Sequence, residues 1–83
     1  MELTIRTAYK SHPNSNVGQV VATAAGRQAT RRIDQAQSSD QNFAAAARLL
    51  ADRLGIREDA KIVETDSNDS GTVRRFTVTE AQA

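Results

Sequence analysis

The chain has 83 residues, a formal net charge of +1 and no cysteine. A chain of this length forms one small domain, and the lack of cysteine excludes disulfide bridges, thiol catalysis and cysteine-based zinc sites. Leu, Ile, Val and Phe together contribute only 16 residues, so we expect a thin core padded with alanine.

The first predicted element is a strand near the start of the chain. Leu3, Ile5, Thr7 and Tyr9 alternate with residues that are mostly more polar, and a period of two is typical of a strand. The next segment, residues 11–18, is rich in turn-forming residues and contains the only proline and the only histidine. Its composition predicts an exposed loop.

Residues 19–34 predict a β-hairpin. Val20, Val21 and Thr23 favour a strand, and Gly26 lies where the chain must reverse. With a tight loop at 25–26 or at 26–27, one set of residues shares the face that packs under the helix: Val20, Ala22, Ala24, Ala29, Arg31 and Ile33. The opposite face carries Val21, Thr23, Gln28, Thr30 and Arg32. Arg31 does not fit an inner face, so we expect it near the sheet margin.

The clearest local signals predict a helix over residues 40–54. Ser38 and Gln41 have the spacing of a capping box, with Ser39 as the alternative N-cap, and Gly55 supplies the left-handed residue that ends a helix. The apolar face is formed by Phe43, Ala47, Leu50 and Leu54, and we expect Phe43, Leu50 and Leu54 to be buried against the sheet. The solvent side is expected to carry Asn42, Ala45, Arg48, Asp52 and Arg53.

Two more strands follow the helix. Residues 57–60 predict a turn, residues 61–65 a short strand, residues 66–71 a second turn and residues 72–79 a final strand with Phe76 and Val78 inward. The element order is β-β-β-α-β-β. This order predicts a single α+β domain over residues 1–83, an antiparallel β-sheet with one amphipathic helix packed across one face.

Four pieces of the chain carry a resemblance. They are Lys10-Ser11-His12-Pro13, Gly26-Arg27-Gln28-Ala29-Thr30, the acidic Asp34 and Arg53-Leu54-Gly55. In these pieces the chain resembles short uncharacterised proteins of actinobacteria and their phages. The resemblance implies a phage or mobile-element context and no particular activity.

Two candidate sites for catalysis or metal binding lack residues that their chemistry needs. His12 is the only side chain that titrates near neutral pH without perturbation, but a catalytic arrangement would need Asp34 or Asp66 to approach it through space. The turn at 66–71 lacks the alternating aspartates and the twelfth-position glutamate of a calcium loop. We therefore expect no enzyme activity, no metal and no cofactor.

Arginine is the residue type most suited to binding a partner here, and it outnumbers lysine nine to two. The candidate binding residues are Arg27, Arg31, Arg32, Arg74 and Arg75. If the strands are neighbours, the helix-free face would carry Thr4, Arg6, Thr23, Thr30, Arg32 and, from the last strand, Arg75. Such a face could contact phosphates. The plainer interpretation is a solvated face with cross-strand polar pairs.

The favoured interpretation is a non-enzymatic protein-interaction module, a phage or mobile-element protein that engages a host protein. Two observations support this interpretation. The chain lacks catalytic groups, and exposed strand edges could accept a strand of a partner. The alternative is a small DNA- or RNA-binding accessory protein that uses the arginine-bearing face. Without an apolar run of membrane-spanning length or a signal-peptide pattern, we expect a cytoplasmic protein with no membrane contact. A homodimer that hides more apolar surface is compatible with the small core.

Overall fold

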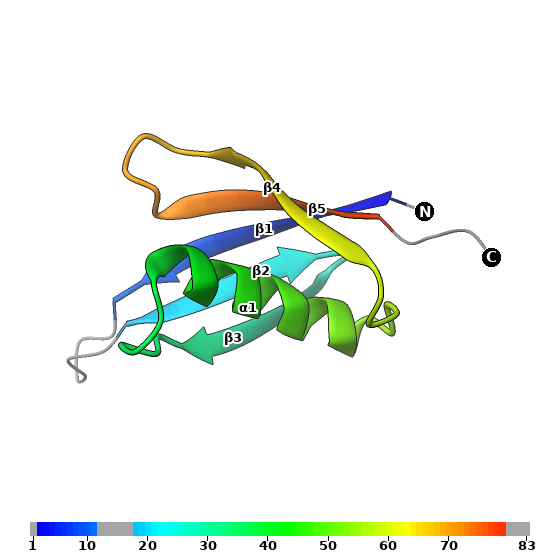
Figure 1. Ribbon diagram of the computed structural model, residues 1–83, viewed down its shortest axis with the longest axis horizontal. Helices are drawn as coiled ribbons and strands as arrows, with labels where there is room; N and C mark the ends of the chain where they lie inside the picture. Colours follow the sequence, from blue (N-terminus) through cyan, green and yellow to red (C-terminus); the bar gives the residue numbers. More distant parts are fainter. Residues whose placement is uncertain (1, 12–17, 80–83) are drawn as a thin grey trace.

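The computed structural model describes residues 2–11 and 18–79 (Figure 1). Within these residues the elements, in chain order, are β1 (Glu2–Lys10), β2 (Gln19–Ala24), β3 (Arg27–Arg32), α1 (Ser39–Arg53), β4 (Lys61–Ser67) and β5 (Val73–Thr79). The strands form one sheet in the order β3-β2-β1-β5-β4, and every neighbouring pair is antiparallel. The α+β class and the element order predicted from the sequence are confirmed.

Strand β1 lies in the centre of the sheet because a hairpin pairs with it on each side. The β2–β3 hairpin pairs through β2, and the β4–β5 hairpin pairs through β5. Between the two hairpins the chain passes through α1, which lies across one face of the sheet and contacts all five strands (Figure 1). No described helix or strand covers the other face, which we call the open face.

The β2–β3 hairpin reverses at Ala25 and Gly26, whose φ angles are 52° and 73°. Two successive residues with positive φ are typical of a type I′ turn, whose twist matches that of the flanking strands. The turn pairs Ala24 with Arg27, so the first of the two predicted loops is the correct one. Strand β3 ends at Arg32, two residues before the predicted end of the hairpin.

Helix α1 has the start and the end that the sequence predicts. The Ser38 hydroxyl accepts a hydrogen bond from Gln41 N at 3.2 Å, and Ser38 N donates to Gln41 Oε1 at 2.9 Å, which completes the capping box. At the other end Gly55 has a φ of 78°, and Ile56 N donates to the carbonyl of Ala51 at 3.0 Å. This closing bond belongs to a Schellman motif.

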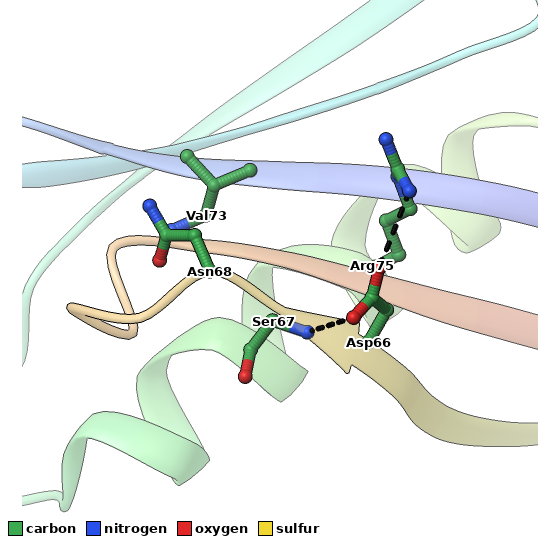
Figure 2. Close-up of a pocket in the computed structure, with 5 residues that line it drawn as sticks. All are labelled: Asp66, Ser67, Asn68, Val73 and Arg75. Atoms are coloured by element: carbon green, nitrogen blue, oxygen red, sulfur yellow. Dashed lines mark hydrogen bonds and ion pairs between the residues drawn. The ribbon is translucent and has the colours of Figure 1, made fainter.

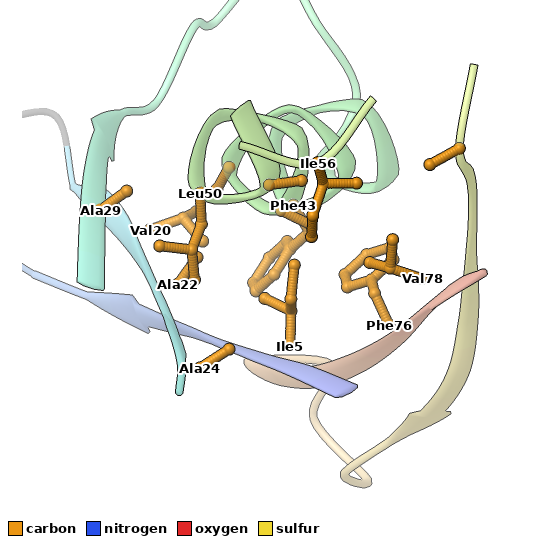
Figure 3. Packing of buried hydrophobic residues seen from close by; sticks show 14 residues of the cluster. Ile5, Val20, Ala22, Ala24, Ala29, Phe43, Leu50, Ile56, Phe76 and Val78 are labelled. Atoms are coloured by element: carbon orange, nitrogen blue, oxygen red, sulfur yellow. The ribbon is translucent and has the colours of Figure 1, made fainter. Parts of the chain in front are cut away.

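The core lies between α1 and the sheet (Figure 3). Phe43 and Leu50 are buried as predicted, whereas Leu54 is only partly buried because it is the C-cap residue at the end of the helix. Phe76 and Val78 point inward as predicted. Buried alanines pad the core where α1 crosses the β2–β3 hairpin: Ala22, Ala24, Ala29, Ala46, Ala47 and Ala51.

The β4–β5 hairpin differs from the prediction because β4 runs to Ser67, two residues further than expected. The register shifts between Glu64 and Asp66, and pairing with β5 resumes beyond this bulge. The loop then closes on Asn68, whose Oδ1 accepts hydrogen bonds from Thr72 N and Val73 N at 2.9 and 3.1 Å. Among residues 2–11 and 18–79, no helix has the length and apolar character needed to cross a membrane.

Candidate partner-binding surface

The structure separates the five candidate arginines between the two sides of the sheet. Side chains alternate along a strand, so the inward Ala29 places Arg27 and Arg31 on the side of α1, and the inward Phe76 places Arg74 there as well. By the same alternation, Arg32 and Arg75 lie on the open face. The five candidate arginines therefore lie on two opposite faces, with Arg32 and Arg75 on the helix-free face as expected.

Arg74 is held by contacts within the protein. Its side chain is only 11% exposed, and its Cζ lies 4.5 Å from the centroid of the Phe43 ring. Nη1 donates hydrogen bonds to Asp40 and, at 3.2 Å, to Glu64, while Nε donates to the carbonyl of Gly71 at 3.0 Å. The hydrogen bond to Asp40 is the main reason why the pKa of Arg74 is raised above its ordinary value. Arg74 thus connects the first turn of α1 to the β4–β5 hairpin.

Arg31 contacts Asn42, and the position of Asn42 differs from the one expected from the sequence. Asn42 was expected on the solvent side of the helix, but it is only 3% exposed. Its Oδ1 accepts hydrogen bonds from Asp34 N at 2.8 Å and from Arg31 Nη1 at 3.3 Å, and its Nδ2 donates to the carbonyls of Asp34 and Ser38 at 3.0 Å. The expectation is wrong because the loop before the helix folds back over its first turn and uses the amide of Asn42.

The other three candidate arginines are exposed. Arg75 Nη1 lies 3.3 Å from Asp66 Oδ2, and the two side chains are 57% and 63% exposed, so this ion pair contributes little to stability. Arg27 extends from the end of the β2–β3 hairpin, and Arg32 lies at the end of β3. Neither forms a hydrogen bond or an ion pair with another residue in the described part of the chain.

An apolar row crosses three strands of the open face. Val21 of β2 is paired with Ala8 of β1, and Ala8 is paired with Val73 of β5. Val21 is 9% exposed, whereas Ala8 and Val73 are half-buried. We call these three residues the apolar row; Thr30 of β3, the partner of Val21, continues it toward the sheet edge.

Cationic side chains lie on both sides of the apolar row. Two residues away along the strands in one direction, Arg6 is paired with Arg75. Two residues away in the other direction, Gln19 is paired with both Lys10 and Arg32. We call Arg6 with Arg75 the first cationic pair and Lys10 with Arg32 the second. Strand geometry places each pair about 6.8 Å from the apolar row.

No aromatic residue lies on the open face. Phe43 and Phe76 are buried in the core, and the strand alternation places Tyr9, the third aromatic residue of the chain, on the side of α1. The Tyr9 ring covers Gly18 so closely that a Cβ atom there would lie 2.4 Å from it. The open face therefore lacks the stacking platforms that proteins use for single-stranded nucleic acid.

The edges of the sheet are less suited to a partner than its open face. The sequence analysis suggested that an exposed edge could accept a strand, and the edge strands are β3 and β4. Strand β4 is interrupted by its bulge, and β3 carries Arg27, Arg31 and Arg32 in only six residues. Bulges, short strands and charged side chains are the features by which proteins protect edges from further pairing.

The turn that was compared with a calcium loop forms a shallow pocket of about 130 Å³ at the Val73 end of the apolar row (Figure 2). Its Asp66 carboxylate accepts a hydrogen bond from Ser67 N and pairs with Arg75. Binding sites for small molecules are usually larger, about 300–1,000 Å³. In the described part of the chain, no three His, Asp or Glu side chains are grouped as metal ligands would be. His12 lies outside the described residues.

Comparison with known proteins gives no match: no family model, no curated protein and no solved structure is significantly similar to the chain. The chemistry of the open face therefore carries the functional conclusion. Sequence reasoning anticipated Arg6, Arg32 and Arg75 on this face, together with its threonines. It did not anticipate the apolar row, because the row exists only in the observed strand order and register.

Proposed function

We propose that the protein is a non-enzymatic protein-interaction module that binds its partner on the open face of the sheet. One observation carries the proposal, the apolar row with a cationic pair on each side of it. Protein interfaces commonly combine an apolar centre with a polar rim, and arginine is enriched in them. The apolar row would form the centre of such an interface, and the cationic pairs would form its rim.

A DNA- or RNA-binding accessory protein is the second candidate, because the same cations suit phosphates. The observed contacts favour a protein partner. Of the candidate arginines, Arg74 is held by Asp40 and Glu64, and Arg31 contacts Asn42 on the opposite side of the sheet. The apolar row offers nothing to a phosphate backbone, whereas apolar side chains of a protein could pack on it.

The proposed partner is a host protein met in the cytoplasm. The resemblance of pieces around Gly26 and Arg53 to phage proteins supports this context. A second copy of the chain is a poorer occupant of the open face. Two open faces related by a twofold axis would bring cations against cations, which disfavours a homodimer at this surface.

Capture from a nuclease-treated lysate of an actinobacterium tests the proposal when two matched variants are compared. Ala8→Arg places a long charged side chain in the middle of the apolar row, whereas Ala44→Arg makes the same change on the exposed side of α1. We expect a protein that is captured by the wild type and by Ala44→Arg but lost with Ala8→Arg. Thermal unfolding by circular dichroism checks that both variants are folded. Capture that needs nucleic acid, or that survives Ala8→Arg, would contradict the proposal.

A further inference from the structure

We infer that the partner presents an acidic amphipathic helix, with one apolar stripe and with Asp or Glu on both flanks of that stripe. The inference rests on the proposed function and adds to it the chemistry of the partner. It follows from the spacing of the apolar row and the two cationic pairs, and from the observation that most of those cations have no carboxylate partner among residues 2–11 and 18–79.

The spacing fits a helix laid along the apolar row. The first and second cationic pairs are four residues apart along β1, from Arg6 to Lys10, which corresponds to about 13–14 Å. A helix with its side chains is about 10–12 Å wide. Its apolar stripe would therefore lie on Val21, Ala8 and Val73 while acidic residues on its two flanks reach the cations.

The length of the row defines the length of the helix that it can hold. Together with Thr30, which continues it onto β3, the apolar row extends over four adjacent strands, which corresponds to about 14 Å at the usual strand separation. At a rise of about 1.5 Å per residue, this distance is covered by roughly ten residues of helix, or nearly three turns. Three turns are enough to place several acidic side chains on each flank.

The charges of the open face select acidic residues for those flanks. Arg6, Lys10 and Arg32 are exposed and form no ion pair with another described residue, and only Arg75 has a carboxylate neighbour, Asp66. The one other strand carboxylate on this face is Glu2, at the far end of β1. Exposed cations that have no carboxylate partner in the described part of the chain favour the approach of an acidic partner and discriminate against neutral or basic ones.

Titration of the isotope-labelled protein with synthetic peptides tests the inference by NMR. The probe is a peptide of about 18 residues, long enough to be helical, with a leucine stripe, glutamate on both flanks and alanine elsewhere. A second peptide carries glutamine in place of every glutamate, and single-stranded and duplex DNA of similar length serve as the nucleic-acid probes. Two charge-reversed variants are compared. The first is a double variant on the open face, Arg6→Glu combined with Arg32→Glu, and the second is the single variant Arg27→Glu on the side of α1.

We expect the glutamate peptide to bind about tenfold more tightly than the glutamine peptide, with amide shifts concentrated at Val21, Ala8 and Val73. The open-face double variant should bind it about tenfold more weakly, and Arg27→Glu should bind it as the wild type does. If the double variant does not fold, Arg6→Gln with Arg32→Gln should show a smaller loss in the same direction. Equal affinity for the two peptides, shifts centred on α1, or tighter saturable binding of DNA would overturn the inference.

Failure of this inference can be told apart from failure of the proposed function. If neither peptide binds but capture from the lysate is still lost with Ala8→Arg, the open face binds a protein of different chemistry, and the acidic helix is wrong. If capture survives Ala8→Arg, the open face is not the interface, and the proposed function fails with the inference.

Discussion

The guanidinium group of Arg74, on β5, lies over the ring of Phe43, in the second turn of α1, with 4.5 Å between Cζ and the ring centroid. Asp40 and Glu64 hold the same guanidinium from the helix and from β4. One side chain therefore connects three elements that are distant in the sequence. Its neighbour Arg75 points to the opposite face and pairs with the exposed carboxylate of Asp66.

This contrast predicts different effects of removing the two adjacent arginines. Arg74→Ala should lower the free energy of unfolding by about 1–3 kcal/mol, because it removes the cation–π contact, packing and several hydrogen bonds. Arg75→Ala, the matched control, should change it by no more than about 0.5 kcal/mol, as expected for an exposed pair. Urea unfolding of both variants measures the difference. Equal effects would contradict the structural role assigned to Arg74.

Asn42→Ala should also destabilise the protein, by about 1–3 kcal/mol, since Asp34 N and the carbonyls of Asp34 and Ser38 would lose their buried partner. Asp52→Ala, on the exposed side of the same helix, is the control and should have little effect. Hydrogen exchange of the Asp34 amide gives a second measurement, and exchange should become faster in Asn42→Ala. An Asp34 amide that stays equally protected would show that the bond to Asn42 is not what orders this loop.

Gly26→Val should destabilise the β2–β3 hairpin through backbone strain alone. The φ angle of 73° disfavours a β-branched residue, while the space around a Cβ atom at this position is open, with nothing within 4 Å. We expect a loss of about 1–2 kcal/mol for valine and a smaller loss for asparagine, which tolerates positive φ better. Thermal unfolding of Gly26→Val and Gly26→Asn measures the two losses. A valine variant as stable as the asparagine variant would count against strain at this turn.

Binding of nucleic acid should be weak and without saturation at a defined site. If phosphates were the true ligand, affinity would fall steeply with salt, and each lost phosphate contact would reduce the log–log slope by roughly 0.7–0.9. Fluorescence anisotropy with labelled DNA and RNA over a range of salt concentrations measures this slope for the wild type, Arg32→Gln and Arg75→Gln. Tight, saturable binding that weakens and loses slope in both variants would favour the second candidate function.

The parts of the fold that depend on local signals could be predicted from the sequence. The capping box at Ser38, the stop at Gly55 and the reversal at Gly26 are each encoded within a few residues, and all three occur as expected. Asn42 was misplaced because its environment depends on the path of the loop before the helix. A signal was present, however, since Asn42, Ala46 and Leu50 recur at intervals of four and share one helical face.

The candidate surface could be predicted only in part. Alternation along β1 and β3 anticipated Arg6 and Arg32 on the helix-free face, because a period of two needs no tertiary information. The same alternation places Arg74 and Arg75 on opposite faces. The sequence does not show, however, that α1 and β4 lie over Arg74 and hold its side chain. The apolar row combines residues of β2, β1 and β5, and no sequence pattern specifies that strand order.

Site-specific photo-crosslinking in cells tests most directly whether the open face binds a protein. A photoreactive amino acid at Thr23, exposed on the open face beside Arg6, is compared with the same residue at Ala44, exposed on α1. The proposed function predicts a discrete protein adduct from position 23 that is absent from position 44 and is lost when Ala8→Arg is added. Adducts to nucleic acid from position 23, or the same protein adduct from both positions, would contradict it.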